Sequence, residues 1–293
     1  MPSPTTTPHR FGRLGETLVM VRFSHTLFAM PFALTGMLLA ARGLPRLQVC
    51  GWILVAMMGA RTAAMTCNRL LDRKIDAGNP RTANRSLPAG RLTPLYACAV
   101  LALSVGLLLL SAWRLNPMAL KLAPLALLIL CGYSFTKRFT SLSHLVLGLS
   151  LAGAPLGAWI AVRGDVSLEP LMLALAVLLW TAGFDVIYAL QDEAFDRSAG
   201  LHSLPVLLGP VRALIMARLF HLLAVILLLA LGRVAALGWF YAAAVVGSAL
   251  LLIVEHRLVS ATDLSRMQMA FFRLNVALGL IVLAGTGVDL LWA

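Results

Sequence analysis

Two polar motifs in this sequence place carboxylates at helical spacing, each directly after a long apolar run. The first contains Asn68, Asp72 and Asp76, each four residues after the one before. On an α-helix, residues four apart lie next to each other on one face. Carboxylate oxygens are the ligands that Mg²⁺ prefers, and bound Mg²⁺ often shares the oxygens of a substrate's phosphates. The first motif therefore indicates a site for a magnesium-bound phosphate compound.

The second motif contains Asp185, Tyr188, Asp192 and Asp196, and its last two acids repeat the spacing of the first pair. The chain has 12 acidic residues, and four of them form these two pairs. Either pair alone is also compatible with an ordinary solvated helix end. Acids at membrane depth are costly and usually functional, so two matched copies favour a shared site. Two such pairs facing each other would hold a magnesium-bound diphosphate.

Basic residues occur near these motifs, and each also has a simpler explanation. Arg81 and Arg85 lie in the polar loop after the first motif, where arginine suits phosphate binding but also a cytoplasmic loop. Tyr133 and Lys137 end an apolar run; they fit an interfacial tyrosine and a topology signal, or a lysine that neutralises a leaving diphosphate. Arg22 precedes the first run and either extends toward lipid phosphates or anchors an anionic substrate.

The histidines and cysteines show no metal-ligand spacing. The cysteines lie in or beside apolar runs, so we expect unpaired packing residues and no disulfide. We assign no role to the histidines at four positions, which are His144, His202, His221 and His256.

The composition is that of a membrane protein with several spans. Of the 293 residues, 60% are hydrophobic and 12% are charged, and the mean hydropathy is +0.89. A soluble chain of this length does not have this composition. The net charge of +12 is also compatible with nucleic-acid binding, but the basic residues lie in short loops between apolar runs. We therefore expect no nucleic-acid partner, and we attribute the charge to membrane topology.

About 20 apolar residues are needed to cross a bilayer, and the sequence contains nine candidate spans. They cover residues 23–41, 47–67, 94–113, 118–136, 142–162, 170–190, 211–231, 234–254 and 270–291. Residues 1–17, which include a run rich in proline and threonine, are expected to form a disordered tail. The predicted fold is an all-α polytopic membrane protein, in which residues 18–293 form one nine-helix domain. We expect two four-helix pseudo-repeats followed by a ninth helix.

Lysines and arginines are concentrated in alternate loops, beginning with the N-terminal tail. The positive-inside rule then places the N-terminus in the cytoplasm and the C-terminus outside. Both acidic motifs follow even-numbered spans, so both emerge on the cytoplasmic side. Repeats of this kind often place a site at their interface. We therefore expect the site to lie on the cytoplasmic side, where the two motifs meet.

With these motifs the chain resembles the UbiA-type intramembrane prenyltransferases over nearly all of its length after the tail. The family patterns are N-x-x-x-D-x-x-x-D and D-x-x-Y-x-x-x-D-x-x-x-D, which begin here at Asn68 and Asp185. Two further segments, R-T-x-x-R-x-L-P-x-G from Arg81 and Y-x-x-x-K-R from Tyr133, resemble the 4-hydroxybenzoate polyprenyltransferases most closely. Ser86 departs from the pattern, because many relatives have proline there, and we expect little consequence.

The resemblance implies nine transmembrane helices around a central cavity that cytoplasmic loops cap. It also implies Mg²⁺-dependent transfer of a polyprenyl group from polyprenyl diphosphate to an aromatic acid, within a bacterial inner membrane, for respiratory quinone biosynthesis. The implied metal ligands are Asp72, Asp76, Asp192 and Asp196. The residues implied to support the metal or bind the diphosphate are Arg22, Asn68, Arg81, Arg85, Lys137 and Asp185. Either Tyr133 or Tyr188 would face the allylic cation with its ring.

The motifs are compatible with more than one aromatic acceptor. The segment from Arg22 to Ala33 resembles a branch of the family that also serves menaquinone made through futalosine. An aromatic acceptor of that branch, dihydroxynaphthoate and haem therefore stand beside 4-hydroxybenzoate. A membrane transporter with an ion site is the alternative from another class. Such a transporter needs charged residues along a path through both faces, and the sparse charge of the outer loops argues against it.

Overall fold

The computed structural model describes residues 12–21, 26–267 and 269–292. Within these ranges all regular secondary structure is helical. Eight helices, or helices with their extensions, are long and apolar enough to cross a bilayer. The helices that form them are α3 (Leu47–Leu71), α5 (Pro94–Leu115), α6 (Pro117–Thr136), α7 (Ser143–Arg163), α8 (Leu168–Ala189), α11 (Pro210–Val234), α12 (Trp239–Leu258) and α13 (Asn275–Leu291). The chain is therefore an integral membrane protein.

A ninth long apolar helix, α2 (Thr26–Ala41), is shorter than the eight others in the described part of the chain. Its expected first residues, and with them Arg22, lie outside the described residues. The count of nine spans therefore stays a prediction. Before α2, the short helix α1 (Arg13–Met20) includes the last residues of the segment expected to be a tail.

Most helix boundaries agree with the spans predicted from hydropathy to within a few residues. The predicted span 234–254 is displaced, because α11 continues to Val234 and α12 begins only at Trp239. A turn separates the two helices, and Ala236 has a positive φ of 51° in it. Hydropathy does not detect this turn because its residues are nearly as apolar as the helices that flank them. A π-helical turn, η3 (Met269–Leu274), leads into α13.

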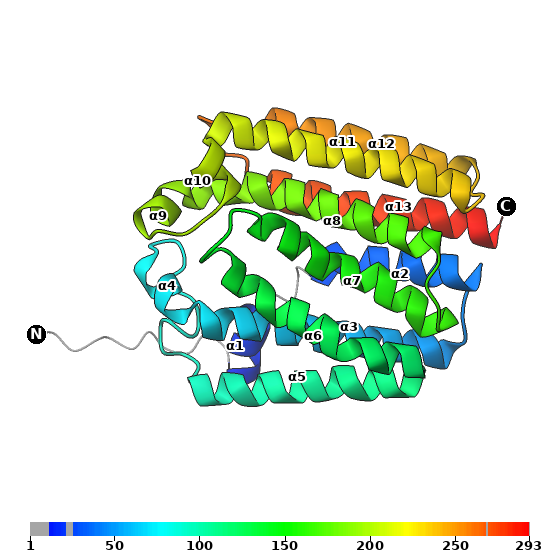
Figure 1. The fold of residues 1–293 in the computed structure, drawn as a ribbon, viewed down its shortest axis with the longest axis horizontal. Helices are drawn as coiled ribbons and strands as arrows, with labels where there is room; N and C mark the ends of the chain where they lie inside the picture. The colour runs from blue at the N-terminus through cyan, green and yellow to red at the C-terminus, as the bar shows by residue number, and fades with distance from the viewer. Residues whose placement is uncertain (1–11, 22–25, 268, 293) are drawn as a thin grey trace, which may run out of the picture.

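The long helices lie side by side along one direction (Figure 1). Three short helices, α4 (Arg73–Gly78), α9 (Glu193–Ser198) and α10 (Leu204–Leu208), gather at one end of the bundle, on the left in Figure 1. Helices α3 and α8 both run to that end, and α13 ends at the opposite one. The two acidic motifs therefore emerge at the same end of the bundle, as the topology predicted.

Small residues let α7 approach its neighbours closely. At Gly148 an added Cβ would lie 2.3 Å from the carbonyl oxygen of Leu178 in α8. At Gly36 in α2 an added Cβ would lie 2.5 Å from the carbonyl oxygen of Pro155 in α7. In membranes, where lipid is as apolar as leucine, such backbone approach is a main source of helix association. Helix α7 is therefore held against both α2 and α8.

We expect Gly148→Ala to destabilise the protein, because the methyl group collides with backbone that cannot rotate away. Overpacking of this kind costs about 1–3 kcal/mol. The matched control is Gly157→Ala in the same helix, where nothing lies within 4 Å of the added Cβ. Thermal unfolding in detergent should show a lower Tm for the first variant and an unchanged or higher Tm for the second. Equal Tm values for both variants would contradict the close α7–α8 contact.

Candidate active site

The first acidic motif lies across the junction of two helices. Helix α3 ends at Leu71, and Asp72 joins it to α4 with a φ of −89° and a ψ of 5°. The backbone N–H of Asp76 still donates to the carbonyl oxygen of Asp72 at 2.7 Å. Because this turn is preserved, both carboxylates remain close together despite the break.

The second motif is also interrupted. Asp185 and Tyr188 belong to α8, Asp192 ends a 3₁₀ turn, η2 (Leu190–Asp192), and Asp196 lies in α9. Short 3₁₀ segments inside longer helical stretches often mark functional sites. Both motifs therefore cross a break in the helix, while the order and spacing of the acids remain helical.

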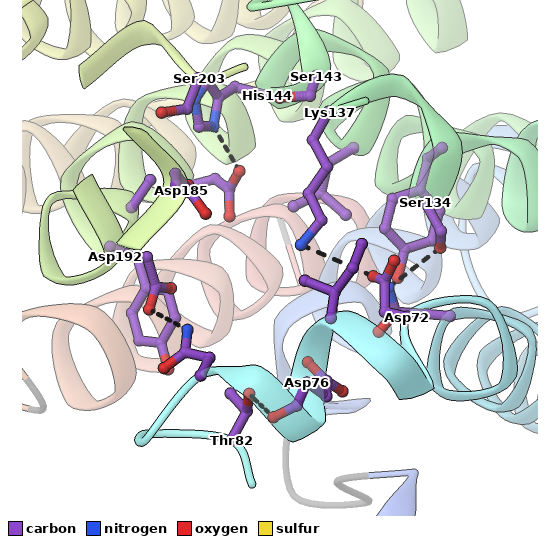
Figure 2. A pocket seen from close by; sticks show the side chains of 18 of the residues that line it. Asp72, Asp76, Thr82, Ser134, Lys137, Ser143, His144, Asp185, Asp192 and Ser203 are labelled. Atoms are coloured by element: carbon purple, nitrogen blue, oxygen red, sulfur yellow. Dashed lines mark hydrogen bonds and ion pairs between the residues drawn. The ribbon is translucent and has the colours of Figure 1, made fainter. Parts of the chain in front are cut away.

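Both motifs line one cavity of about 280 Å³ at the end of the bundle where α4, α9 and α10 gather. In Figure 2, Asp72 and Asp76 lie on one wall, and Asp185 and Asp192 lie on the opposite wall. Lys137 reaches into the space between the walls. Every predicted site residue that the structure describes lines this cavity. These residues are Asn68, Asp72, Asp76, Arg81, Arg85, Tyr133, Lys137, Asp185, Tyr188, Asp192 and Asp196.

Asp72 is held by groups from α3 and from the end of α6. The Nδ2 of Asn68 donates to its carboxylate at 2.8 Å and to the hydroxyl of Ser134 at 3.1 Å. Lys137 Nζ lies 3.8 Å and Arg138 Nη2 lies 3.3 Å from the carboxylate oxygens. Asn68 therefore belongs to the site. Arg138 is a cationic partner of Asp72 to which the sequence reading gave no role in the site.

Asp76 is buried and is bound by arginine. The Nη1 of Arg85 lies 2.7 Å from each of its two carboxylate oxygens. Arg69 Nη1 lies 3.8 Å from the same carboxylate. The hydroxyl of Thr82 donates to the backbone carbonyl of Asp76 at 2.9 Å, which ties the following loop to the motif. Two cations and one loop contact therefore stabilise a carboxylate that would otherwise be costly to bury.

Arg81 connects this loop to the second motif, because its side chain bonds Asp192 and Tyr188. Its Nε donates to Asp192 Oδ1 at 2.8 Å, its Nη2 also binds the Asp192 carboxylate, and its Nη1 donates to the hydroxyl of Tyr188 at 2.9 Å. The Nδ2 of Asn79 adds a bond to Asp192 at 3.1 Å. Burial opposes the charged guanidinium, but the bonds to Asp192 outweigh it and raise the pKa of Arg81. The loop after the first motif therefore closes over the cavity.

Asp185 has a different kind of partner. Its Oδ2 lies 2.6 Å from Nδ1 of His144, a buried residue of α7. The Nε2 of His144 in turn accepts a bond at 3.2 Å from the backbone N–H of Leu204. The sequence reading assigned no role to His144 or to His202, yet both line the cavity. No spacing pattern connects residue 144 to residue 185, so only the packing of α7 on α8 reveals the pair.

The deeper part of the cavity is apolar and aromatic. The ring of Phe271 lies 4.4 Å from that of Tyr188 and 5.4 Å from that of Phe184, measured between centroids. Phe28 packs 5.6 Å from Phe184 and also lines the cavity. Leu151 lines the same space. The cavity therefore joins a charged region at the end of the bundle to an apolar region between the helices.

The donor set fits Mg²⁺ that is shared with a ligand. Among the described residues, no three His, Cys, Asp or Glu side chains converge into a ready metal cluster. Instead, carboxylates of the two motifs line opposite walls of one cavity. Mg²⁺ usually binds one or two carboxylates and completes its shell with water and substrate phosphates. Facing carboxylates with intervening space therefore suit a bridging ion better than a closed cage.

The cavity of this polytopic membrane protein combines facing acids, arginines and an aromatic interior. Such a cavity suits a ligand with an anionic head group and an apolar tail. A profile of the UbiA prenyltransferase family matches residues 29–277. The chain therefore belongs to the UbiA prenyltransferase family.

Named relatives and solved structures agree with this assignment. The chain is 32% identical over 251 residues to the 4-hydroxybenzoate octaprenyltransferase of Citrobacter koseri, covering 85% of this chain and 86% of the relative. It resembles the apo structure of a UbiA homologue from Aeropyrum pernix K1 with a TM-score of 0.83 and 38% identity, over 91% and 98% of the two chains. A UbiA homologue from Archaeoglobus fulgidus bound to GPP and Mg²⁺ has a TM-score of 0.69 and 20% identity, over 92% and 99%.

Ser86 has a structural role that the sequence reading did not expect. Its hydroxyl donates to Oε2 of Glu16 at 2.7 Å, and Arg91 Nε donates to the same oxygen at 3.1 Å. Glu16 lies in α1 and is only 5% exposed. The hydroxyl of Thr17 also lies 3.0 Å from the hydroxyl of Tyr96. Helix α1 is thereby fastened to the loop that carries the site's arginines, through a residue that proline could not replace.

We expect Glu16→Ala to lower the stability of the protein, because it leaves the buried hydroxyl of Ser86 without its acceptor and removes one partner of the half-buried Arg91. An unsatisfied buried polar group costs about 1–3 kcal/mol. The control is Glu193→Ala, which breaks the exposed ion pair with Arg197 four residues away; such pairs contribute about 0.3–0.5 kcal/mol. Thermal unfolding in detergent should separate the two variants, and equal Tm losses would refute the proposed fastening.

Proposed function

We propose that this protein transfers a polyprenyl group from polyprenyl diphosphate to an aromatic acid, with 4-hydroxybenzoate as the acceptor, in respiratory quinone biosynthesis. The observation that carries the proposal is the cavity itself, where two acidic motifs and several cations face each other above an aromatic interior. The octaprenyltransferase of Citrobacter koseri supports the acceptor by its name and its match over most of the chain. The Archaeoglobus fulgidus homologue supports a prenyl diphosphate with Mg²⁺.

Mg²⁺ would be held by carboxylates of both motifs, which are Asp72, Asp76, Asp192 and Asp196. When bound, Mg²⁺ supplies positive charge that stabilises the negative charge developing on the diphosphate. Asn68 orients the Asp72 carboxylate through its bond at 2.8 Å. Asp192, Asp76 and Asp72 pair with Arg81, Arg85 and Lys137, so cations already surround three of the carboxylates that would hold the ion.

The cations of the cavity would bind the diphosphate oxygens. Arg81 and Arg85 come from the loop over the cavity, and Lys137 and Arg138 come from the end of α6. Guanidinium groups suit phosphate oxygens because they donate in a planar fork. When the carbon–oxygen bond of the donor breaks, the diphosphate leaves with the electron pair, and fixed positive charge stabilises this leaving group. Arg22, which lies outside the described residues, is expected to join this set.

The aromatic interior would exclude water and face the reacting carbon. An allylic cation is attracted to the face of an aromatic ring within about 6 Å. The guanidinium carbon of Arg81 already lies 5.3 Å from the centre of the Tyr188 ring. This contact supports Tyr188, and not Tyr133, as the ring next to the allylic carbon. The electron-rich ring of the acceptor then attacks this carbon.

The membrane explains the location of the site. A tail of many isoprene units is best solvated by lipid, so the donor and product would lie partly in the bilayer. We place the protein in a bacterial inner membrane with the N-terminus in the cytoplasm, the C-terminus outside and the site on the cytoplasmic side. The loop basicity supports this orientation. Two four-helix pseudo-repeats followed by a ninth helix would bring the two motifs together at the repeat interface.

Purified protein in detergent should prenylate 4-hydroxybenzoate when it is supplied with geranyl diphosphate and Mg²⁺, with the product detected by mass spectrometry. The product should disappear with EDTA. Asp72→Asn and Asp192→Asn should each lower kcat by at least about 10²-fold, because each removes charge that organises the transition state. Asp165→Asn is the control, because its side chain is exposed and lies outside the cavity.

The outcomes separate the alternatives. Mg²⁺-dependent donor binding without product from 4-hydroxybenzoate would move the search to dihydroxynaphthoate, a futalosine-branch aromatic or haem. Neither product nor donor binding by a folded protein would favour a transporter. Normal turnover by Asp72→Asn would refute the metal assignment.

A further inference from the structure

His144 bridges three separate segments at the wall of the cavity. It lies near the start of α7 and is only 3% exposed. Its Nδ1 lies 2.6 Å from Oδ2 of Asp185 in α8, and its Nε2 accepts from the N–H of Leu204 at the start of α10. Figure 2 shows the dashed line between His144 and Asp185. The imidazole is therefore fixed at both ring nitrogens.

The two bonds determine the tautomer. A backbone N–H can only donate, so Nε2 of His144 must carry a lone pair toward Leu204. A neutral imidazole has one N–H, which must then sit on Nδ1 and donate to the Asp185 carboxylate. The ring is therefore a neutral donor, and Asp185 is a carboxylate bonded to it.

This pairing distinguishes Asp185 from other acids in the cavity. Asp72, Asp76 and Asp192 are each paired with arginine or lysine, so a neighbouring cation offsets their charge. Asp196 in α9 forms no ion pair in the described part of the chain, and no histidine orients it as His144 orients Asp185. A neutral imidazole orients a carboxylate without cancelling its charge. The side chain of Asp185 is 25% exposed, so part of it faces the cavity.

We propose that His144 is a positioning residue that aims Asp185 at the aromatic acceptor, and that Asp185 takes the proton the acceptor loses. The inference rests on the proposed prenyl transfer. A bond forms between the allylic carbon of the donor and a ring carbon of the acceptor, while the carbon–oxygen bond to diphosphate breaks. The proton on the attacked ring carbon passes to the Asp185 carboxylate, and its bonding electrons restore the aromatic ring. Asp185 then returns the proton to water.

The surroundings of the pair suit this step. Leu147 lies one helical turn after His144 on α7, and Phe184 precedes Asp185 on α8; both line the cavity. An aromatic acceptor next to these apolar side chains would place a ring proton near the carboxylate, away from bulk water. The bond from Leu204 adds precision, because it stops the imidazole from rotating away. A base held in this way contributes about 10²–10⁴-fold in rate.

The first test uses variants of His144 that separate its two bonds. His144→Leu removes both bonds and should lower kcat by about 10–100-fold, the usual effect of losing an orienting partner. His144→Asn places an amide N–H near the position of Nδ1 and should recover most of that loss, although it cannot reach Leu204. The matched control is His221→Leu, which removes another buried imidazole that contacts α8, outside this cavity. Mg²⁺-dependent donor binding and the donor KM should stay at the wild-type level in all three variants.

The second test reads the proton transfer directly. 4-Hydroxybenzoate deuterated at the ring carbons next to the hydroxyl should show a larger deuterium isotope effect on kcat in His144→Leu and Asp185→Asn than in wild type. A merely structural role would lower activity without changing this isotope effect. Wild-type kcat in His144→Leu, an unchanged isotope effect in both variants, or equal kcat losses in His144→Asn and His144→Leu would each overturn the proposal.

Assays of the wild-type protein distinguish a failure of this inference from a failure of the proposed function. If wild-type protein converts another aromatic acceptor and not 4-hydroxybenzoate, the acceptor assignment fails, and the same variants are compared with that acceptor deuterated at its reacting carbon. If wild-type protein prenylates no aromatic acceptor, the proposed function fails and this inference falls with it. If wild-type protein turns over and the variants behave as wild type, only the inference about His144 fails.

Discussion

The structure depends on the pairing of buried charges at one end of a membrane bundle. A carboxylate taken out of water is costly unless a partner repays the lost hydration. Asp76 is bound by Arg85 at 2.7 Å and Asp192 is bound by Arg81, and both arginines come from one loop. The loop thus supplies the counter-charge of both motifs, and the acids it covers help to hold it in place. This mutual dependence explains why the site forms where α3 and α8 end together.

The same pairing suits a protein that exchanges anionic ligands. Arginines that satisfy carboxylates also satisfy phosphate oxygens, since the two acceptors share geometry and charge. The proposed donor would therefore meet cations that are already in place. The loop does not depend on these ion pairs alone, because Glu16 of α1 accepts from Ser86 and Arg91 on its far side. This second attachment holds the loop over the cavity independently of the acids.

Spacing in the sequence predicted the acids, the helical fold and the shared end of the bundle, because these follow from hydropathy and from periods of three to four residues. It did not predict the helix breaks at Asp72 and at residues 190–192, since backbone bonds across each break keep the helical order of the acids. It also assigned no role to His144 and little to Ser86. Their partners lie on other elements, so no local pattern marks them, and only tertiary packing brings them to the site.

Four carboxylates of the cavity divide into two kinds by the charge of their partners. Asp72, Asp76 and Asp192 are bound to arginine or lysine, as suits groups that alternate between protein cations and a metal ion, while Asp196 forms no ion pair in the described part of the chain. Asp185 is bound to a neutral imidazole whose other nitrogen is occupied by a backbone N–H, so it is oriented without being neutralised. A transfer that separates diphosphate from an allylic carbon and then removes a ring proton needs both kinds of carboxylate. In the proposed reaction, the neutral partner therefore favours Asp185 for the proton, while the cationic partners favour Asp72, Asp76 and Asp192 for the metal.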